Sequence, residues 1–203
     1  MNFGAVILAG GQSSRMGRDK AWLTCGGCSL LARQSELARE LGAAEIFISG
    51  RPGVDYSSLH FPVLTDAPPH AGPLAGIAAA LRAVRQPQLL VLAVDMPLLT
   101  VDFLRRLHAR LRPGVGAIPR RGEVIEPLAA FYPQSAGAGL DHLAPAAGGR
   151  FTPGAKHFAQ WCVQSGCAQW VPVPPADEQL FASWNAPADL PPPLRFSAAK
   201  PNS

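Results

Sequence analysis

The sequence has no apolar run approaching the roughly 18–20 residues that a membrane-spanning helix requires. The short apolar stretch near its start has no basic segment before it and ends at two glycines. That pattern is typical of a strand followed by a turn, not of a secretion signal. We therefore expect a cytoplasmic protein that has no membrane partner.

Charge is also sparse, with charged residues making up 16% of the chain. The 18 lysines and arginines are scattered, without a long basic run or interleaved aromatic residues. A net charge of +4 therefore suits a small polyanionic substrate as well as it suits nucleic acid, and we do not expect nucleic acid as a partner. Hydrophobic residues make up 48% of the 203 residues, enough for one core. We expect one domain at 1–190 and a proline-rich, flexible tail at 191–203.

Cysteine is rare, with four in the chain. Cys25 and Cys28 have the C-x-x-C spacing, which is compatible with zinc binding or redox chemistry. A four-ligand zinc site would need a second pair at a similarly tight spacing, whereas four residues separate Cys162 from Cys167. Ordinary reduced thiols are the favoured interpretation, and the role of the first pair stays open.

Strand and helix patterns alternate along most of the chain. The apolar runs 5–9 and 88–94 are typical of buried parallel strands. Further strands are expected at 45–49, 61–65, 116–119, 127–132 and 169–173, and helices at 29–41, 73–84, 101–111, 134–144 and 154–164. This alternation predicts βαβ units with right-handed crossovers and an open, mostly parallel sheet.

The first strand leads into a loop, Leu8–Lys20, whose composition suits a phosphate group. Gly10 and Gly11 let backbone N–H groups approach an anion closely, and Ser13 adds a hydroxyl donor. Arg15 offers a planar fork for phosphate oxygens, and Lys20 offers a mobile positive charge. In open α/β sheets, ligands lie outside the carboxyl ends of strands, where this loop is expected.

Two well-known phosphate-binding templates do not fit this loop. A P-loop needs a lysine after its second glycine, whereas Arg18 follows Gly17, and the dinucleotide fingerprint G-x-G-x-x-G is absent. From these residues alone, a phosphate cradle and a glycine turn with solvated basic side chains both remain possible.

The loop resembles the L-A-G-G-x-S-x-R-M-G-x-D-K signature of molybdenum cofactor guanylyltransferases, which belong to the wider nucleotidyltransferase superfamily. Further segments resemble the family's motifs in the expected order, and the matches span residues 5–190. These segments are Asp66 with Gly72–Gly76, then Val94–Pro97, Glu126–Leu128 and Asn185–Leu190. The resemblance implies an α/β nucleotidyltransferase fold, with three α/β/α layers in a Rossmann-like (GT-A-like) arrangement around a mostly parallel central sheet.

The same resemblance implies transfer of GMP from GTP to the terminal phosphate of molybdopterin, with Mg²⁺ as the cofactor and pyrophosphate as the second product. The attacking phosphate is already an anion, so no strong protein base is needed, and the sequence has no obvious Ser/His/Asp or Cys/His arrangement. Other cofactor-biosynthesis proteins or recipient molybdoenzymes are possible partners. A relative that uses CTP or another phosphorylated acceptor is an alternative, although cytidylyl-transferring relatives typically have L-A-A-G at Leu8–Gly11. A nucleotide-binding module without turnover is a further alternative.

Asp95 follows the most hydrophobic expected strand, where an unpaired carboxylate is costly to bury. We expect it to bind Mg²⁺, which prefers oxygen ligands shared with substrate phosphates. Thr100 is a better helix cap than Asp95 for the helix expected at 101–111. The resemblance suggests Asn185 as a second metal ligand, although a cap before Pro187 explains it equally well.

The resemblance also assigns residues to the two substrates. The expected catalytic residues are Arg15, Lys20 and Asp95. The expected nucleotide pocket consists of Leu8, Ala9, Gly10, Gly11, Ser13, Arg15, Lys20, Arg51, Asp66, Gly72, Gly76 and Asp95. Arg51 stands where family members commonly have an asparagine, so its contact is open. The acceptor is expected near Arg121, Glu126 and Lys156, for which ordinary surface charge is an equal alternative.

Overall fold

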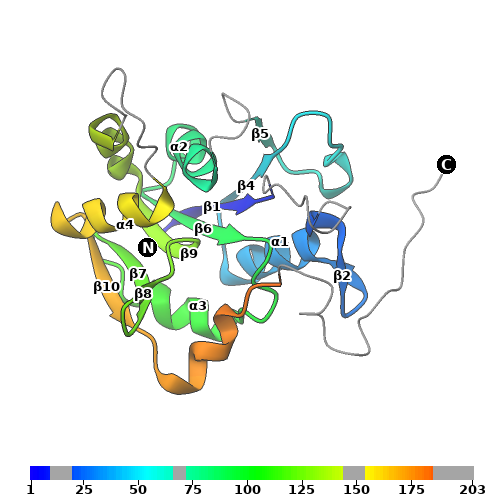
Figure 1. Cartoon of the computed structure of the whole chain (residues 1–203). Helices are drawn as coiled ribbons and strands as arrows, with labels where there is room; N and C mark the ends of the chain where they lie inside the picture. The colour runs from blue at the N-terminus through cyan, green and yellow to red at the C-terminus, as the bar shows by residue number, and fades with distance from the viewer. Residues whose placement is uncertain (10–19, 66–71, 144–153, 185–203) are drawn as a thin grey trace.

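We describe the computed structural model of the chain over residues 1–9, 20–65, 72–143 and 154–184 (Figure 1). Its main sheet contains β1 (Phe3–Leu8), β4 (Glu45–Gly50), β5 (Val63–Thr65), β6 (Gln88–Ala93), β7 (Gly116–Arg121), β8 (Val124–Ile125), β9 (Ala129–Pro133) and β10 (Ala168–Pro172). A separate hairpin contains β2 (Thr24–Cys25) and β3 (Cys28–Ser29). The α-helices are α1 (Leu30–Leu41), α2 (Pro73–Ala83), α3 (Val101–His108) and α4 (Ala155–Gln164). Short 3₁₀ helices are η1 (Lys20–Trp22), η2 (Ser57–Leu59), η3 (Gln134–Leu143) and η4 (Pro175–Phe181).

The main sheet is mostly parallel, as the alternating pattern predicts. Its strand order is β10-β7-β9-β6-β1-β4-β5, with β8 paired to β7. β9 runs antiparallel to both of its neighbours, and β8 runs antiparallel to β7, while the remaining pairs are parallel. The strand expected at 127–132 is therefore real, but it reverses direction within the sheet.

Helices cover both faces of this sheet, as Figure 1 shows, and give the three expected layers. Alternate residues of a strand point to opposite faces. Accordingly, Ala5 and Ile7 pack in one core with α1 and α3, whereas Val6 and Leu8 pack in a second core with α2 and α4. All six residues of β1 are buried, which explains its continuous apolar sequence.

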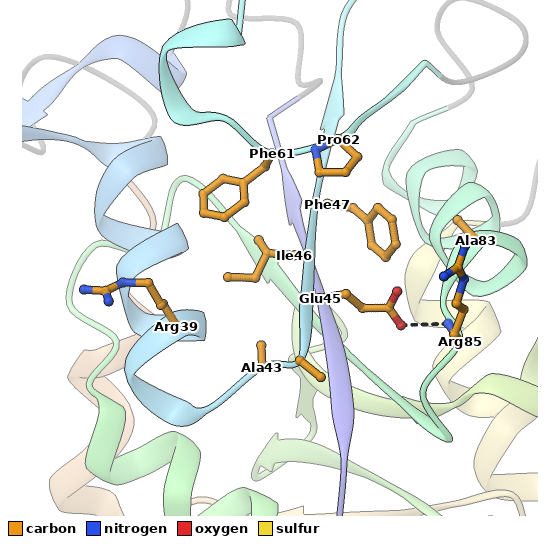
Figure 2. A pocket seen from close by; sticks show the side chains of 10 residues that line it. Arg39, Ala43, Glu45, Ile46, Phe47, Phe61, Pro62, Ala83 and Arg85 are labelled. Atoms are coloured by element: carbon orange, nitrogen blue, oxygen red, sulfur yellow. Dashed lines mark hydrogen bonds between the residues drawn. The ribbon is translucent and has the colours of Figure 1, made fainter.

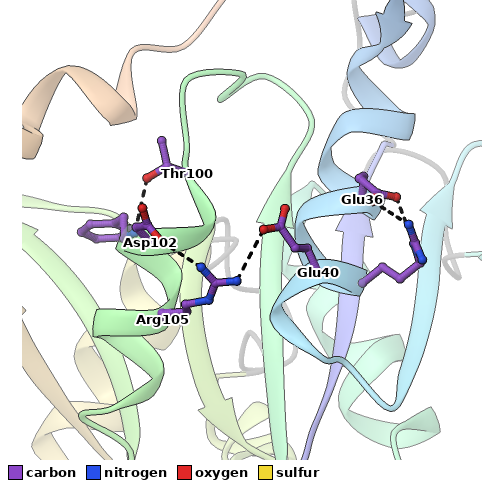
Figure 3. Close-up of polar contacts among 7 residues, drawn as sticks. Glu36, Glu40, Thr100, Asp102 and Arg105 are labelled. Carbon is purple, nitrogen blue, oxygen red and sulfur yellow. Dashed lines mark hydrogen bonds and ion pairs between the residues drawn. The ribbon is translucent and has the colours of Figure 1, made fainter.

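Side-chain caps position the helices of the first core. The Ser29 hydroxyl accepts a hydrogen bond from the Ala32 N–H at 3.1 Å, and α1 ends at Gly42, whose φ is 95°. The Thr100 hydroxyl caps α3 in the same way (Figure 3). Arg105 on α3 forms ion pairs with Asp102 and with Glu40 of α1. These pairs are exposed, so they contribute little beside the apolar contacts between the helices.

Several elements differ from the expectations. The segment expected as an α-helix at 134–144 is the 3₁₀ helix η3, whose two glycines, Gly137 and Gly139, disfavour a regular α-helix. A side chain at Gly139 would overlap the ring of Trp161, so the close contact with α4 requires glycine there. The hairpin β2–β3 and the strand β8 have only two residues per strand and carry no period for a pattern search to detect.

The strand order places the ends of β1 and β6 side by side. From β1 the chain passes to β4 and β5 on one side and then returns through α2 to β6 on the other side. Leu8 is the register partner of Ala93, so both carboxyl ends reach the same edge of the sheet. A point where the connections diverge in this way is the usual ligand site of open α/β sheets. Within the four described segments, no helix has the length and apolar character needed to cross a bilayer.

Candidate active site

Asp95 lies at this edge, two residues beyond the end of β6. The Val94 N–H donates to the Leu8 carbonyl at 3.3 Å, which joins the turn after β6 to the end of β1. Asp95 is partly buried. Burial raises the pKa of its carboxyl above the ordinary value, and the nearby positive charge of Lys20 acts in the opposite direction. A carboxylate held with little water around it gains stability from a bound cation.

Three hydrogen bonds hold the backbone around Asp95. The Gln34 side chain of α1 donates to the Met96 carbonyl at 2.7 Å, and the adjacent Arg33 Nε donates to the Pro97 carbonyl at 2.5 Å. The Trp184 N–H donates to the carbonyl of Asp95 at 2.8 Å. The sequence patterns did not identify these supports. The available signal was Gln34 itself, a polar residue on the apolar face of α1 and fully buried in the structure.

Lys20 belongs to a separate segment and lies near enough to Asp95 for its positive charge to lower the pKa of that carboxyl. It begins η1, where its carbonyl accepts the Leu23 N–H at 3.1 Å. The next residue, Ala21, is fully buried and anchors the turn in the core. Trp22 then stacks on Tyr56, with ring centroids 6.1 Å apart. Two of the three expected catalytic residues are therefore close enough to interact electrostatically.

The three residues expected near the acceptor lie together. Asp95, Glu126 and Lys156 line one hollow of about 380 Å³. Arg121 Nε donates to Glu126 Oε1 at 2.8 Å, and its guanidinium lies 5.5 Å from the ring centre of Phe181. The side chains of Arg121 and Glu126 are only 26% and 14% exposed, so they are not solvated surface charges.

The remaining described residues of the expected nucleotide pocket flank the ends of β1 and β4. The Ala9 N–H donates to the Ser49 carbonyl at 2.9 Å, and the Arg51 N–H donates to the Tyr56 hydroxyl at 3.2 Å. Gly72 precedes α2 with a φ of 71°, a value that favours glycine. At Gly76 a side chain would overlap the Ser49 hydroxyl and approach Leu8, so this glycine has a packing role in α2.

The remaining expected site residues lie outside the described segments. They are Gly10, Gly11, Ser13, Arg15, Asp66 and Asn185. Their proposed contacts therefore stay predictions.

A larger hollow, of about 530 Å³, lies at the other end of the sheet (Figure 2). It surrounds the start of β4, opposite the edge that carries Asp95. The Glu45 carboxylate in it accepts backbone N–H groups of Arg85 and Gln86 at 2.7 and 3.1 Å, so it joins β4 to the segment before β6. The functional residues expected from the sequence do not line this hollow, and we assign it no role in the reaction.

The Asp95 region fits a divalent metal shared with a substrate. Within the described segments, no three His, Cys, Asp or Glu side chains group as a metal-binding cluster. Mg²⁺ commonly binds through one or two carboxylates and completes its coordination with phosphates and water. The single desolvated carboxylate of Asp95 suits that mode.

Comparison with known proteins shows the family to which the chain belongs. Residues 5–181 match the family model of the MobA-like NTP transferase domain. A probable molybdenum cofactor guanylyltransferase of Opitutus terrae is 36% identical over 187 residues, covering 91% of each chain. One of a Nostoc species is 33% identical over 195 residues, covering 93% of this chain and 89% of the relative.

A solved structure of a named relative has a similar fold. The crystal structure of molybdopterin-guanine dinucleotide biosynthesis protein A from Archaeoglobus fulgidus superimposes with a TM-score of 0.67 and 23% identity, covering 92% of this chain and 94% of that one. Since the family match runs from β1 to the end of η4 and the curated relatives cover nine tenths of the chain, this protein belongs to the MobA-like family and is a nucleotidyltransferase.

Proposed function

We propose that the protein transfers GMP from GTP to the terminal phosphate of molybdopterin, releasing pyrophosphate. The observation that carries this proposal is the position of Asp95. It interacts with Lys20 at the edge where β1 and β6 end, and it also borders the hollow that contains Glu126 and Lys156. This position would put one carboxylate between the proposed triphosphate side and the proposed acceptor side. The names of the curated relatives support guanylyl transfer to this acceptor.

The reaction is an in-line displacement at the α-phosphorus of GTP. An oxygen of the acceptor phosphate forms the new P–O bond as the bond to pyrophosphate breaks. Because the nucleophile is an anion already, the protein must bring two anions together and offset their charge. Lys20 offsets charge on the triphosphate, and Arg15 from the same loop is proposed to act beside it.

Asp95 is the proposed ligand for Mg²⁺, with Asn185 as a second oxygen donor. Bound Mg²⁺ would neutralise phosphate charge and orient the triphosphate. The hydrogen bonds from Gln34 and Arg33 keep the Asp95 turn fixed, so the carboxylate does not need to reorganise during the reaction. Asp66 and Arg51 are proposed to contact the nucleotide.

The acceptor is proposed to occupy the hollow beside Asp95. Lys156 supplies a positive charge on its wall, and Arg121 holds Glu126 through the ion pair described above. A fixed and mostly buried carboxylate is a good acceptor for ring N–H groups such as those of a pterin. Glu126 would therefore orient the pterin while Lys156 faces its phosphate.

The proposal is tested by incubating the protein with α-labelled GTP, Mg²⁺ and molybdopterin and following pyrophosphate release and the labelled guanine dinucleotide. Asp95→Asn is the informative variant, because it preserves shape and removes the charge. We expect a loss of at least about 100-fold in kcat while the thermal melt remains that of a folded protein.

A matched control is Glu36→Gln, which removes an exposed carboxylate of α1 that pairs with Arg39. It should retain wild-type turnover. Faster turnover with CTP than with GTP would overturn the guanylyl assignment, and nucleotide binding without pyrophosphate release from any nucleotide would overturn transferase activity with this acceptor. Full turnover by folded Asp95→Asn would remove Asp95 from the mechanism.

A further inference from the structure

The two cysteines of the C-x-x-C segment face each other across a tight hairpin. Cys25 ends β2, Cys28 begins β3, and they are direct partners in the antiparallel register. Gly26 and Gly27 form the turn with φ values of 61° and 87°. Positive φ at both positions is the geometry of a type I′ turn, which favours glycine. The turn therefore sets the register that brings the two thiols to the same face.

The spacing suits a disulfide. Directly opposed residues in antiparallel strands have Cα atoms about 4.5–5.5 Å apart, within the roughly 4.4–6.8 Å that a disulfide spans. The Cys28 thiol donates to the Cys25 carbonyl at 3.5 Å, which places its sulfur over the opposite strand. Both cysteines are free thiols and only partly buried, so a small reagent can reach them in the folded protein.

A metal site at this hairpin is less well supported. A closed structural zinc site takes four ligands, and the part of the chain described contains no grouping of three or more His, Cys, Asp or Glu side chains. Burial raises the pKa of the Cys25 thiol, while the positive charge of Arg33 lowers it. That cation stabilises a thiolate but repels a metal ion.

The other two cysteines provide an internal contrast. Cys162 is fully buried in the second core, and burial raises the pKa of its thiol far above the ordinary value. Reaction with disulfides requires a thiolate that the reagent can reach. Cys162 should therefore stay reduced under conditions that oxidise the hairpin, so that no disulfide forms between Cys162 and the partly buried Cys167.

We propose that Cys25 and Cys28 form a reversible dithiol–disulfide site that reacts with low-molecular-weight disulfides such as oxidised glutathione. One cysteine thiolate attacks a sulfur of the reagent, and its S–S bond breaks as a glutathione thiolate leaves. The second cysteine thiolate attacks the resulting mixed disulfide, forming the Cys25–Cys28 bond and releasing the second glutathione. The protein loses two electrons and two protons, and the reagent becomes two glutathione thiols.

The disulfide would link two strands that are already hydrogen-bonded at the base of the hairpin. The Leu30 N–H donates to the Leu23 carbonyl at 2.8 Å and closes the base of the hairpin, which connects the Lys20 turn to α1. Because the strands are already in register, oxidation requires no new pairing.

Trypsin separates the two cysteine pairs for analysis. Cleavage after Lys20 and Arg33 gives a peptide, 21–33, that contains only Cys25 and Cys28, whereas Cys162 and Cys167 fall in the peptide 157–195. The folded protein is equilibrated with defined ratios of reduced to oxidised glutathione, quenched by alkylation and analysed by mass spectrometry. We expect peptide 21–33 to lose two hydrogen atoms, to regain them with dithiothreitol, and to do so while Cys162 in peptide 157–195 remains alkylated.

Single variants show whether the two thiols act together. Cys25→Ser and Cys28→Ser should each retain the mixed disulfide with glutathione, whereas the wild-type protein should accumulate at least about tenfold less of it, because the partner thiol is present at high effective concentration. In urea the difference in mixed disulfide between the wild-type and variant proteins should shrink, since the hairpin register is lost.

Three results would overturn the proposal. These are a peptide 21–33 that stays alkylated on both cysteines, equal amounts of mixed disulfide in wild-type and variant proteins, and stoichiometric protection of both thiols by Zn²⁺. The experiment uses no nucleotide or molybdopterin, so its outcome is independent of the proposed transferase activity.

Discussion

Replacing Gln34 by leucine tests whether α1 positions the carboxylate of Asp95. The change removes the 2.7 Å hydrogen bond to the Met96 carbonyl, next to Asp95, and preserves the approximate size of the side chain. A buried carbonyl left without its donor costs about 1–3 kcal/mol. The Gln34 Oε1 atom is buried without a hydrogen-bond partner within the described segments, so its removal offsets part of that cost. We expect a net loss of about 1–2 kcal/mol, which lowers Tm by roughly 2–8 °C in a chain of this size.

Such a loss leaves the protein folded at 25 °C, because domains commonly have about 5–15 kcal/mol of stability. The kcat should fall by about 10-fold or more, because small misplacements of a catalytic group are costly. The assay is pyrophosphate release at 25 °C over a Mg²⁺ titration, with Tm measured in parallel. Gln34→Leu should also require more Mg²⁺ for half-maximal rate.

The control lies on the same helix. The Ser35 hydroxyl is buried but donates to the Leu31 carbonyl within α1, away from the Asp95 turn. Ser35→Ala should lower Tm slightly and leave the Mg²⁺ dependence unchanged. If Gln34→Leu loses stability but retains the wild-type kcat and Mg²⁺ dependence, Gln34 supports the core only and the positioning argument is refuted.

Three further variants test other parts of the structure. Burial raises the folded-state pKa of Asp95, so ionisation favours the unfolded state. Asp95→Asn should therefore gain Tm relative to wild type as pH rises from the ordinary carboxyl pKa through the folded value, whereas the Tm difference should stay constant at lower pH; a Tm difference independent of pH over the whole range would contradict this. Arg121→Ala leaves Glu126 without its partner and should raise the acceptor KM about 10-fold while the GTP KM stays constant; Arg121→Lys should recover part of the loss, and an equal rise in both KM values would refute the assignment. Gly76→Ala, whose new methyl group would overlap the Ser49 hydroxyl, should destabilise by about 1–3 kcal/mol in urea denaturation, whereas Gly137→Ala, with only ordinary contacts, should be near neutral; equal stabilities would count against the packing role.

The long periodic elements could be predicted from the sequence because local signals specify them. The caps Ser29 and Thr100 and the terminal Gly42 mark helix ends, and the uniformly apolar runs mark buried strands. The direction of β9 could not be predicted in this way. A run such as 129–133 is buried equally in parallel and antiparallel pairing, and only its position between β6 and β7 decides the direction.

The site also contains residues that the sequence could identify and residues that it could not. Asp95 could be singled out because a carboxylate at the end of an apolar strand is costly to bury without a partner, and Lys20 because it stands in a glycine-rich loop that suits a phosphate. The family resemblance then implied their roles. Gln34, Arg33 and Trp184 could not, because each reaches the Asp95 turn from a distant part of the chain.

By itself the sequence determined the chemical types present: a phosphate-suited loop, a carboxylate at a strand end and a glycine turn between two cysteines. These are local properties, set by side-chain chemistry and backbone preference over a few residues. Only the tertiary structure decided that Lys20 acts on Asp95, that Glu126 and Lys156 share a hollow with it, and that Arg121 holds Glu126. These relations join segments separated by up to about 75 residues or connect through a strand reversal. The order of strands in the sheet, which no short stretch of sequence encodes, brings them together.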